Sequence, residues 1–182
     1  MALLVALAGG LSGCSTLSHW WDGLFPLPPQ PELDFTRVML RRTGCLRSRC
    51  PRYEVVVHGD GRVWYDGWHD VAVHGRHVGR ANPPAMTKLR ILLARNELYW
   101  MAGRYTPMRD HCRHWAPDGS MAIIELRSTA FDKHIVHYSG CYGAPPLLAE
   151  IENAIDAAAG DGRWVRGNLG ADAGVKADGN SS

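Results

Sequence analysis

Residues 43–67 read TGCLRSRCPRYEVVVHGDGRVWYDG, and this stretch decides the fold. The side chains of residues 53–58 alternate between two faces, the period of two that indicates a β-strand. Gly59-Asp60-Gly61 then supplies the positive-φ residues of a tight hairpin turn, and residues 62–65 return as the partner strand. A close cysteine pair and a proline precede the first strand. The stretch therefore predicts a disulfide-stapled β-hairpin at the start of a small secreted domain.

The remainder of the chain predicts further strands and two helices. Strand patterns occur at residues 33–42, 68–74, 121–126 and 134–138. Helices are expected from Asn82 to about Asn96 and from Pro145 to Gly160, because both segments repeat apolar residues at helical spacing. Residues 75–80 are expected to form a polar turn, and residues 97–105 are less regular. We therefore expect an α+β fold, an antiparallel sheet of about five strands with two helices packed on one face.

Length and charge limit the classes of function. The chain has 182 residues, enough for one domain with a real core and short for two. Its net charge is +2, and basic residues are interspersed with acidic ones, so we expect no nucleic-acid partner. Beyond its N-terminus, no apolar run reaches the ~18 residues that a membrane-spanning helix needs.

The N-terminus resembles a lipoprotein signal. Ala2–Gly10 is an apolar run of signal-peptide length, and Leu11-Ser12-Gly13-Cys14 follows it. This order resembles the lipobox of bacterial lipoproteins, in which a peptidase cuts before the cysteine and its thiol carries a diacylglyceryl group. No Lys or Arg precedes the apolar run, which leaves three alternatives: a true start further upstream, a weak signal, or a buried apolar segment with a chance cysteine. Ser15 indicates sorting to the outer membrane of a Gram-negative cell.

These features divide the chain into four parts. Residues 1–13 are the expected signal peptide, 14–32 the lipidated cysteine with a proline-rich tether, 33–166 the globular domain and 167–182 a disordered tail. A lipid on Cys14 would anchor the protein to the membrane without spanning it. The expected location is therefore the outer membrane, with the domain facing the periplasm.

Four cysteines remain once Cys14 carries the lipid: Cys45, Cys50, Cys112 and Cys141. An even number in an oxidising compartment indicates disulfides, and four cysteines allow three pairings. The close spacing favours a local bridge between Cys45 and Cys50. Cys112 would then tie a long polar loop to Cys141, which stabilises the fold by roughly 3–4 kcal/mol in the chain-entropy model.

Two other roles compete for these residues. Cys45 and Cys50 could exchange disulfides, since the nearby arginines would lower a thiol pKa, although reactive pairs usually have the spacing C-x-x-C. Imidazole groups suit zinc or copper, and the candidate metal ligands are His111, His114 and His137, with His134 as a substitute. His134 and His137 lie three apart on one strand and face opposite sides, so only one of them can join a site.

The sequence contains none of the G-x-S-x-G, H-E-x-x-H or G-x-x-x-x-G-K motifs of common enzymes. Aspartates do lie near histidines on the expected strands and turns, a proximity that we interpret as chance: Asp60, Asp66 and Asp70 near His58, His69 and His74. We therefore expect neither catalysis nor a cofactor.

Several separated motifs together resemble one protein family. They are Arg42-Thr43-x-Cys45, Cys50-Pro51-x-Tyr53, Gly59-Asp60-Gly61-x-Val63-x-Tyr65-x-Gly67, Tyr138-x-Gly140-Cys141, Gly143-Ala144-Pro145, and Ile155-Asp156 before Trp164. From about Val38 to Val165 they resemble a family of bacterial lipoproteins known as a domain of unknown function (number six-four-three-eight). In that family the first cysteine pair is closer and encloses a glycine, whereas the Leu46–Arg49 loop here is longer and basic. The resemblance implies a cell-envelope location and no assigned activity.

The functional prediction is therefore a cell-envelope lipoprotein of unknown activity, a non-catalytic binding or structural module. Its partners would be the membrane, through Cys14, and an envelope protein or a small ligand. Arg47 and Arg49, in the loop that the first disulfide closes, are the residues expected to contact that partner. Metal binding and thiol–disulfide exchange are the alternatives.

Overall fold

The computed structural model describes residues 32–45, 49–108 and 111–166, which belong to the second of two units in the chain, Pro31–Ser182. Its strands are β1 (Phe35–Thr43), β2 (Arg52–His58), β3 (Arg62–His69), β4 (Gly75–Arg80), β5 (Arg104–Tyr105), β6 (Met121–Ser128) and β7 (Asp132–Tyr138). Its helices are α2 (Pro83–Leu93), α3 (Asn96–Trp100), α4 (Pro146–Ala159) and α5 (Asp161–Val165). Within these residues, no helix has both the length and the apolar character needed to cross a bilayer. The expected signal peptide, Cys14 and the tail lie outside the described residues.

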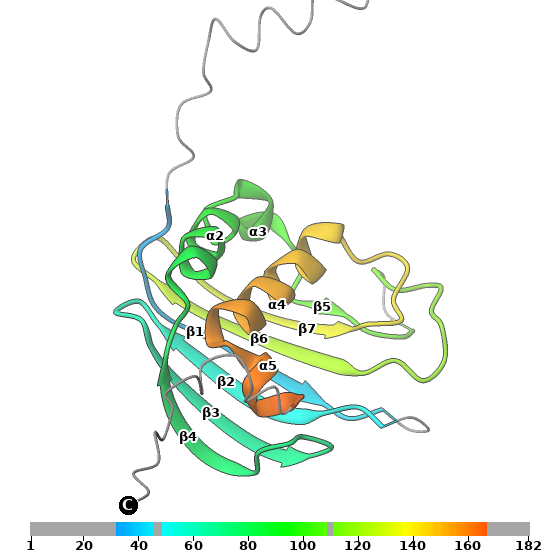
Figure 1. Ribbon diagram of the computed structural model, residues 1–182. Coiled ribbons are helices and arrows are strands. Elements are labelled where there is room, and N and C mark those ends of the chain that lie inside the picture. Colours follow the sequence, from blue (N-terminus) through cyan, green and yellow to red (C-terminus); the bar gives the residue numbers. More distant parts are fainter. Residues whose placement is uncertain (1–31, 46–48, 109–110, 167–182) are drawn as a thin grey trace, which may run out of the picture. The chain divides into compact units, whose positions relative to one another are not determined.

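The strands form one sheet in the order β4-β3-β2-β1-β6-β7-β5 (Figure 1). The hairpin predicted from residues 53–65 is confirmed: β2 and β3 pair antiparallel, with Val55 opposite Tyr65 and Val57 opposite Val63. Gly61 in the turn has a φ of 83°, a conformation open to glycine and strained for most other residues. β1 lies in the middle of the sheet, between β2 and the distant β6.

The expected sheet of about five antiparallel strands is wrong. The sheet has seven strands and is mixed, since β5 runs parallel to β7 while every other pair is antiparallel. The described residues also form four helices rather than two, of which α3 and α5 are short. The sequence missed β4 because an edge strand packs little against the core and needs no apolar alternation. It missed β5 because two residues carry no period.

The separate strand expected at residues 68–74 is absent from the structure. β3 continues to His69, and the chain then turns at Asp70, which has a φ of 52°. The N–H groups of Ala72 and Val73 donate to carbonyls at the end of α5, at 3.1 and 2.9 Å. A helix terminus thus takes the hydrogen bonds that a neighbouring strand would have supplied.

Both long helices begin where the sequence indicates and α4 also ends there, but α2 ends at Leu93, short of the expected Asn96, where the separate helix α3 begins. Asn82 caps α2, its side chain accepting from the Ala85 N–H at 3.3 Å, and Gly160 ends α4 in the left-handed conformation. Both helices lie across one face of the sheet (Figure 1). The side chains between them and the sheet include five with no exposed surface: Leu89, Leu93, Leu148, Ile151 and Ile155. In the part of the chain that is described, no helix covers the opposite face.

The structure contains both disulfides that the cysteine spacing favours. Cys45–Cys50 closes the connection from β1 to β2, with Cα atoms 5.6 Å apart. Cys112–Cys141 joins the loop after β5 to the turn after β7, with Cα atoms 5.4 Å apart. The second bridge is buried and fixes the chain just before α4 begins.

Candidate functional site

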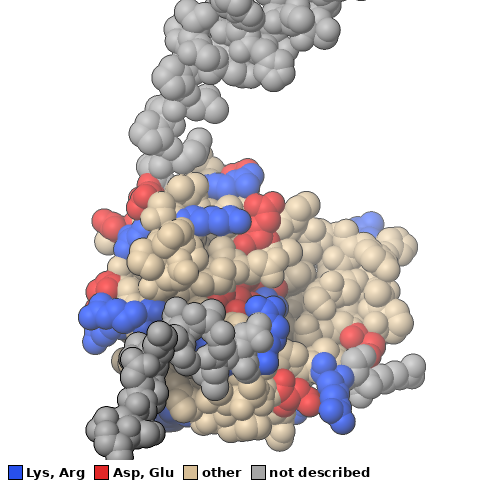
Figure 2. Space-filling model, in the orientation of Figure 1, with Lys and Arg blue, Asp and Glu red and all other residues tan. Residues whose placement is uncertain are grey.

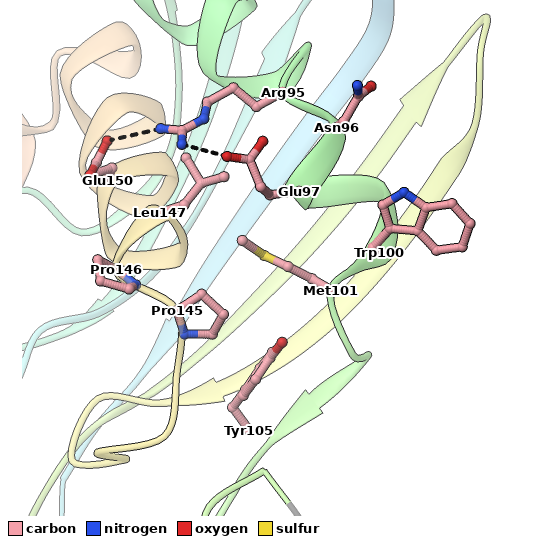
Figure 3. Close-up of a pocket in the computed structure, with 10 residues that line it drawn as sticks. All are labelled: Arg95, Asn96, Glu97, Trp100, Met101, Tyr105, Pro145, Pro146, Leu147 and Glu150. Carbon is pink, nitrogen blue, oxygen red and sulfur yellow. Dashed lines mark hydrogen bonds and ion pairs between the residues drawn. The ribbon is translucent and has the colours of Figure 1, made fainter.

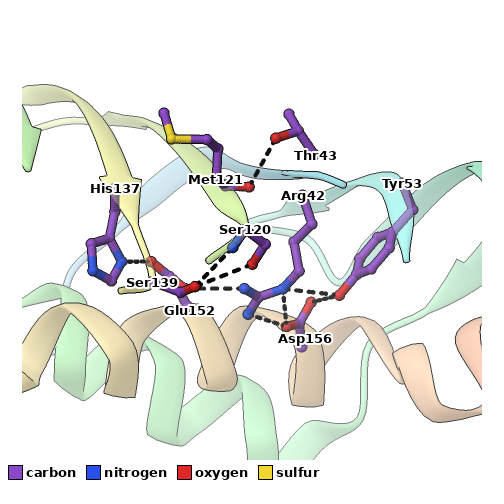
Figure 4. Close-up of polar contacts among 9 residues, drawn as sticks. All are labelled: Arg42, Thr43, Tyr53, Ser120, Met121, His137, Ser139, Glu152 and Asp156. Carbon is purple, nitrogen blue, oxygen red and sulfur yellow. Dashed lines mark hydrogen bonds and ion pairs between the residues drawn. The ribbon is translucent and has the colours of Figure 1, made fainter. Parts of the chain in front are cut away.

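Five ionisable side chains form a network between the sheet and α4, which we call the Arg42 network (Figure 4). Arg42 donates from Nη1 to Glu152 Oε2 at 3.1 Å and from Nη2 to Asp156 Oδ2 at 2.7 Å. Tyr53 Oη donates to Asp156 Oδ1 at 2.8 Å. His137 Nδ1 lies 2.6 Å from Glu152 Oε1. The network therefore connects three strands of the sheet to one helix.

Local geometry brings these side chains together. Arg42 and Tyr53 are direct partners across β1 and β2, so both side chains lie on the face that α4 covers. Glu152 and Asp156 are four residues apart on α4 and thus lie on one side of the helix. His137 extends from the same face of β7 and reaches the nearer carboxylate.

Burial controls the electrostatics of this network. Desolvation raises the pKa of Asp156 to about 6, against the opposing attraction of the Arg42 guanidinium and its hydrogen bonds. Desolvation also raises the pKa of the Tyr53 hydroxyl, and the nearby Asp156 carboxylate raises it further. Burial opposes the charge on Arg42, but Asp156, Tyr53 and Glu152 together outweigh that effect and raise its pKa. Arg42 therefore stays a cation.

The Arg42 network is better suited to holding the fold together than to chemistry. Its polar groups already bind one another, and Arg42 keeps only 17% of its side chain exposed. A substrate would have to break buried ion pairs to reach any of them, at a cost of several kcal/mol. We interpret the network as the connection that fixes the position of α4.

A cleft of about 650 Å³ opens between α3 and the start of α4 (Figure 3). It is lined by Arg95, Asn96, Glu97, Trp100, Met101, Tyr105, Pro145, Pro146, Leu147 and Glu150. Three of these side chains are buried and apolar or aromatic: Met101, Tyr105 and Leu147. The two prolines at the start of α4 form one wall, and α3 forms the other. The cleft therefore has an apolar floor.

The rim of the cleft is charged. Arg95 donates to Glu97 Oε1 at 2.7 Å, and its other terminal nitrogen lies 4.0 Å from Glu150 Oε2. The hydrogen bond from Arg95 lowers the pKa of Glu97, so this carboxylate is ionised at neutral pH. Trp100, 80% exposed, stands at the edge of the cleft. An apolar floor bordered by a few polar groups is the usual composition of a binding site.

The cleft and the Arg42 network are linked through shared elements. Leu147 and Glu150, which line the cleft, lie on the turn of α4 that precedes Glu152. On the sheet, Tyr105 of the cleft floor pairs with His137 of the network. The ion pairs of the network thus hold in place the helix that forms one wall of the cleft.

Of the residues predicted to contact a partner or a metal, those that the structure describes lie at separate places. Arg47 lies outside the described residues, and Arg49 is exposed beside the first disulfide. His137 is buried against Glu152, whereas His134 is exposed on the other face of the strand, as their spacing predicts. His111 and His114 line a second hollow of about 370 Å³ that does not include His137. Among residues 32–45, 49–108 and 111–166, no three His, Cys, Asp or Glu side chains form a group that could hold a metal.

Charge does not gather on the face that carries the helices. Figure 2 shows basic and acidic side chains side by side there, with uncharged surface between them. The cleft is distinguished from the rest of this surface by its apolar floor and by Trp100, and not by a cluster of like charges.

Sequence reasoning missed both the network and the cleft. The available signal was the pair Glu152 and Asp156, two acidic residues one turn apart beside the apolar stripe of the predicted α4 helix. Buried acids need partners, so this pair predicts a buried cation. Nothing in the sequence identifies that cation as Arg42, 114 residues from Asp156.

Comparison with known proteins identifies the family. No curated protein and no solved structure matches the chain. The family model for a domain of unknown function (DUF6438) matches residues 36–159, which include all five members of the Arg42 network and all ten residues that line the cleft. On this match, the chain belongs to the DUF6438 family.

Proposed function

We propose that this protein is a lipid-anchored domain of the bacterial cell envelope that binds a partner protein in the α3–α4 cleft and has no catalytic role. The observation that carries the proposal is Trp100, which is 80% exposed at the edge of a hollow with an apolar floor. Large exposed aromatic side chains beside concave apolar surface are typical of interaction hot spots.

The chemistry of the cleft favours a protein segment over a charged metabolite. Met101 and Leu147 offer apolar contact, while Pro145 and Pro146 present a rigid wall. The charges of the rim already neutralise one another in part through Arg95. An extended segment with one large apolar residue would bury that residue on the floor and leave its backbone to the polar rim.

The envelope location rests on Cys14 and the proline-rich tether that follows it. Lipid on Cys14 would hold the domain at the membrane, and the proline-rich segment would separate the domain from the lipid so that it could reach partners in the periplasm. In cells fed radiolabelled palmitate, the wild-type chain should become labelled and the Cys14→Ser variant should not. Equal labelling of both would contradict the anchor.

Photo-cross-linking in cells tests the cleft. A photoreactive amino acid at position 100 should form an adduct with one defined partner, in cells that naturally produce the protein. Position 142 is the control, because Tyr142 is 74% exposed but lines the hollow of His111 and His114 instead of the cleft.

The purified partner then gives the quantitative test. Trp100→Ala should weaken its binding by about tenfold or more, as expected for an aromatic hot spot, and Tyr142→Ala should leave it unchanged. An equal yield of cross-linked adduct from positions 100 and 142, or unchanged partner binding by Trp100→Ala, would contradict the proposal.

A further inference from the structure

β4 is an edge strand, bonded to β3 on one side only. Its direct partners on β3 place three of its side chains on the helix-free face: Arg76 opposite Asp66, Val78 opposite Trp64 and Arg80 opposite Arg62. On β3, the partners Arg62, Trp64 and Asp66 alternate with the buried Val63 and Tyr65, whose side chains face the helices. Along the open edge, the helix-free face therefore presents the pattern basic, apolar, basic.

The backbone of the same three residues points away from β3. In an antiparallel ladder, successive residues direct their N–H and C=O groups to opposite sides. The Ala81 N–H donates to the Gly61 carbonyl at 2.9 Å, so the odd-numbered residues of this strand face β3. Residues 76, 78 and 80 then face the open edge. In the described part of the chain, the one hydrogen bond to that edge comes from Arg163, which reaches the Arg80 carbonyl at 3.5 Å.

Exposed apolar surface lies beside this edge. Val78 is 75% exposed and Trp64 is 50% exposed, and both line a hollow of about 390 Å³ together with Val56. The Arg76 side chain is 92% exposed and forms a long ion pair with Asp66 at 3.4 Å. An added strand would thus find both unpaired backbone groups and an apolar contact.

The charges on β4 disfavour a second copy of this chain as the added strand. Antiparallel self-pairing about Val78 would place Arg76 of each copy opposite Arg80 of the other, and parallel self-pairing would stack each arginine on its own copy. Like charges directly opposite destabilise a strand pair. Exposed charges of this kind are a common device against edge-to-edge aggregation, and they favour a partner of opposite charge.

We propose that β4 binds an extended acidic segment of a partner protein by strand addition. Antiparallel pairing would place acidic residues opposite Arg76 and Arg80 and an apolar residue opposite Val78, in the pattern acidic–any–apolar–any–acidic. Main-chain hydrogen bonds to the edge give affinity, and the alternate side chains give specificity. This surface is separate from the α3–α4 cleft and does not depend on what the cleft binds.

A pair of synthetic peptides tests the charge pattern. One has the sequence Thr-Glu-Thr-Val-Thr-Glu-Thr with a fluorescent label, and its control carries Lys in place of both Glu. With the full chain as Cys14→Ser, the Glu peptide should bind and the Lys peptide should not, as measured by fluorescence anisotropy.

Charge reversal then locates the site. The double variant Arg76→Glu with Arg80→Glu should weaken binding of the Glu peptide by about tenfold or more and should allow the Lys peptide to bind. The matched control is Arg37→Glu with Arg127→Glu, which makes the same charge change on the helix-free face at β1 and β6, away from β4. Equal weakening by both double variants would mean attraction to the whole face and would overturn the proposal.

A proline at position 78 tests strand addition itself. Val78→Pro removes one N–H from the open edge and none from the ladder with β3, so the fold should persist by circular dichroism. It should abolish peptide binding, whereas Val78→Ala should only weaken it. Binding by Val78→Pro at wild-type strength, no binding of the Glu peptide by the wild type, or a dimer that Val78→Pro dissociates would each overturn the proposal. Trp100→Ala should leave peptide binding unchanged, which keeps this test distinct from that of the cleft.

Discussion

Two arginines in this protein each contact two carboxylates, and they differ in their exposure to water. Arg42 is 17% exposed, and its partners Glu152 and Asp156 are 6% and 12% exposed. Arg95 is 39% exposed, and its partners Glu97 and Glu150 are 58% and 54% exposed. The first set holds α4 on the sheet, and the second lies on the rim of the cleft.

The difference in burial assigns different roles to the same chemistry. An exposed ion pair contributes about 0–1 kcal/mol and can rearrange at little cost, which suits the rim of the proposed binding cleft. Removing one member of a buried pair leaves an uncompensated charge and costs about 3–5 kcal/mol. The Arg42 network therefore provides a rigid wall beside a rim that can adapt.

Arg42→Met should produce the largest effect. The change keeps most of the side-chain length but leaves Glu152 and Asp156 buried without their cation, so the free energy of unfolding should fall by about 3–5 kcal/mol. Urea unfolding at neutral pH measures this loss. A loss below about 1 kcal/mol would show that the buried ion pairs of Arg42 contribute no more than exposed ones, and would contradict the difference drawn between Arg42 and Arg95.

Asp156 should make stability depend on pH. Its pKa is about 6 in the folded protein and 3.8 when unperturbed, so between these values the folded state holds a proton that the unfolded chain releases. Its contribution to the free energy of unfolding is therefore fully present below about pH 4 and is lost as pH rises through about 6. Asp156→Asn should remove this component, on the order of 1–3 kcal/mol, from unfolding curves measured at pH 4 to 7. The same pH dependence in both proteins would contradict the assignment.

Arg95→Met should have the smallest effect on stability. Its partners stay hydrated when the guanidinium is removed, so the free energy of unfolding should fall by less than about 1 kcal/mol. The difference from wild type should shrink further in 1 M salt, since exposed charges are then screened within about 3 Å. If the free energy of unfolding fell by several kcal/mol regardless of salt, the ion pairs of the rim would stabilise the fold as strongly as those of the Arg42 network.

The sequence predicts the local parts of this fold best. Residues 53–65 form the expected hairpin because both strands and the turn lie within one short segment. Asn82 and Gly160 mark helix ends because capping depends on neighbouring residues. β4 could not be predicted in this way. It lies at the edge of the sheet and its side chains are mostly exposed, so its sequence lacks the apolar alternation that indicates a strand.

The candidate sites depend on distant contacts and were mostly beyond reach. Arg42, Tyr53 and Asp156 each belong to motifs that carry the family resemblance, yet no spacing rule brings β1 and α4 together. The histidines show the opposite error. Their residue type suggested metal binding, whereas in the fold His137 pairs with Glu152. The cleft combines residues of α3, β5 and α4, which only the assembled structure unites.

The central place of β1 has a consequence for the order of folding. Its pairing with β2 is local, but its other neighbour is β6, so that Thr43 lies beside Met121, 78 residues later. The first four strands can form a meander early, but its open side along β1 stays unpaired until β6 and β7 arrive. We therefore expect the rate-limiting step to be the docking of the β6–β7 hairpin on β1. Substitutions at that seam should slow refolding more than equally destabilising ones in the β2–β3 hairpin.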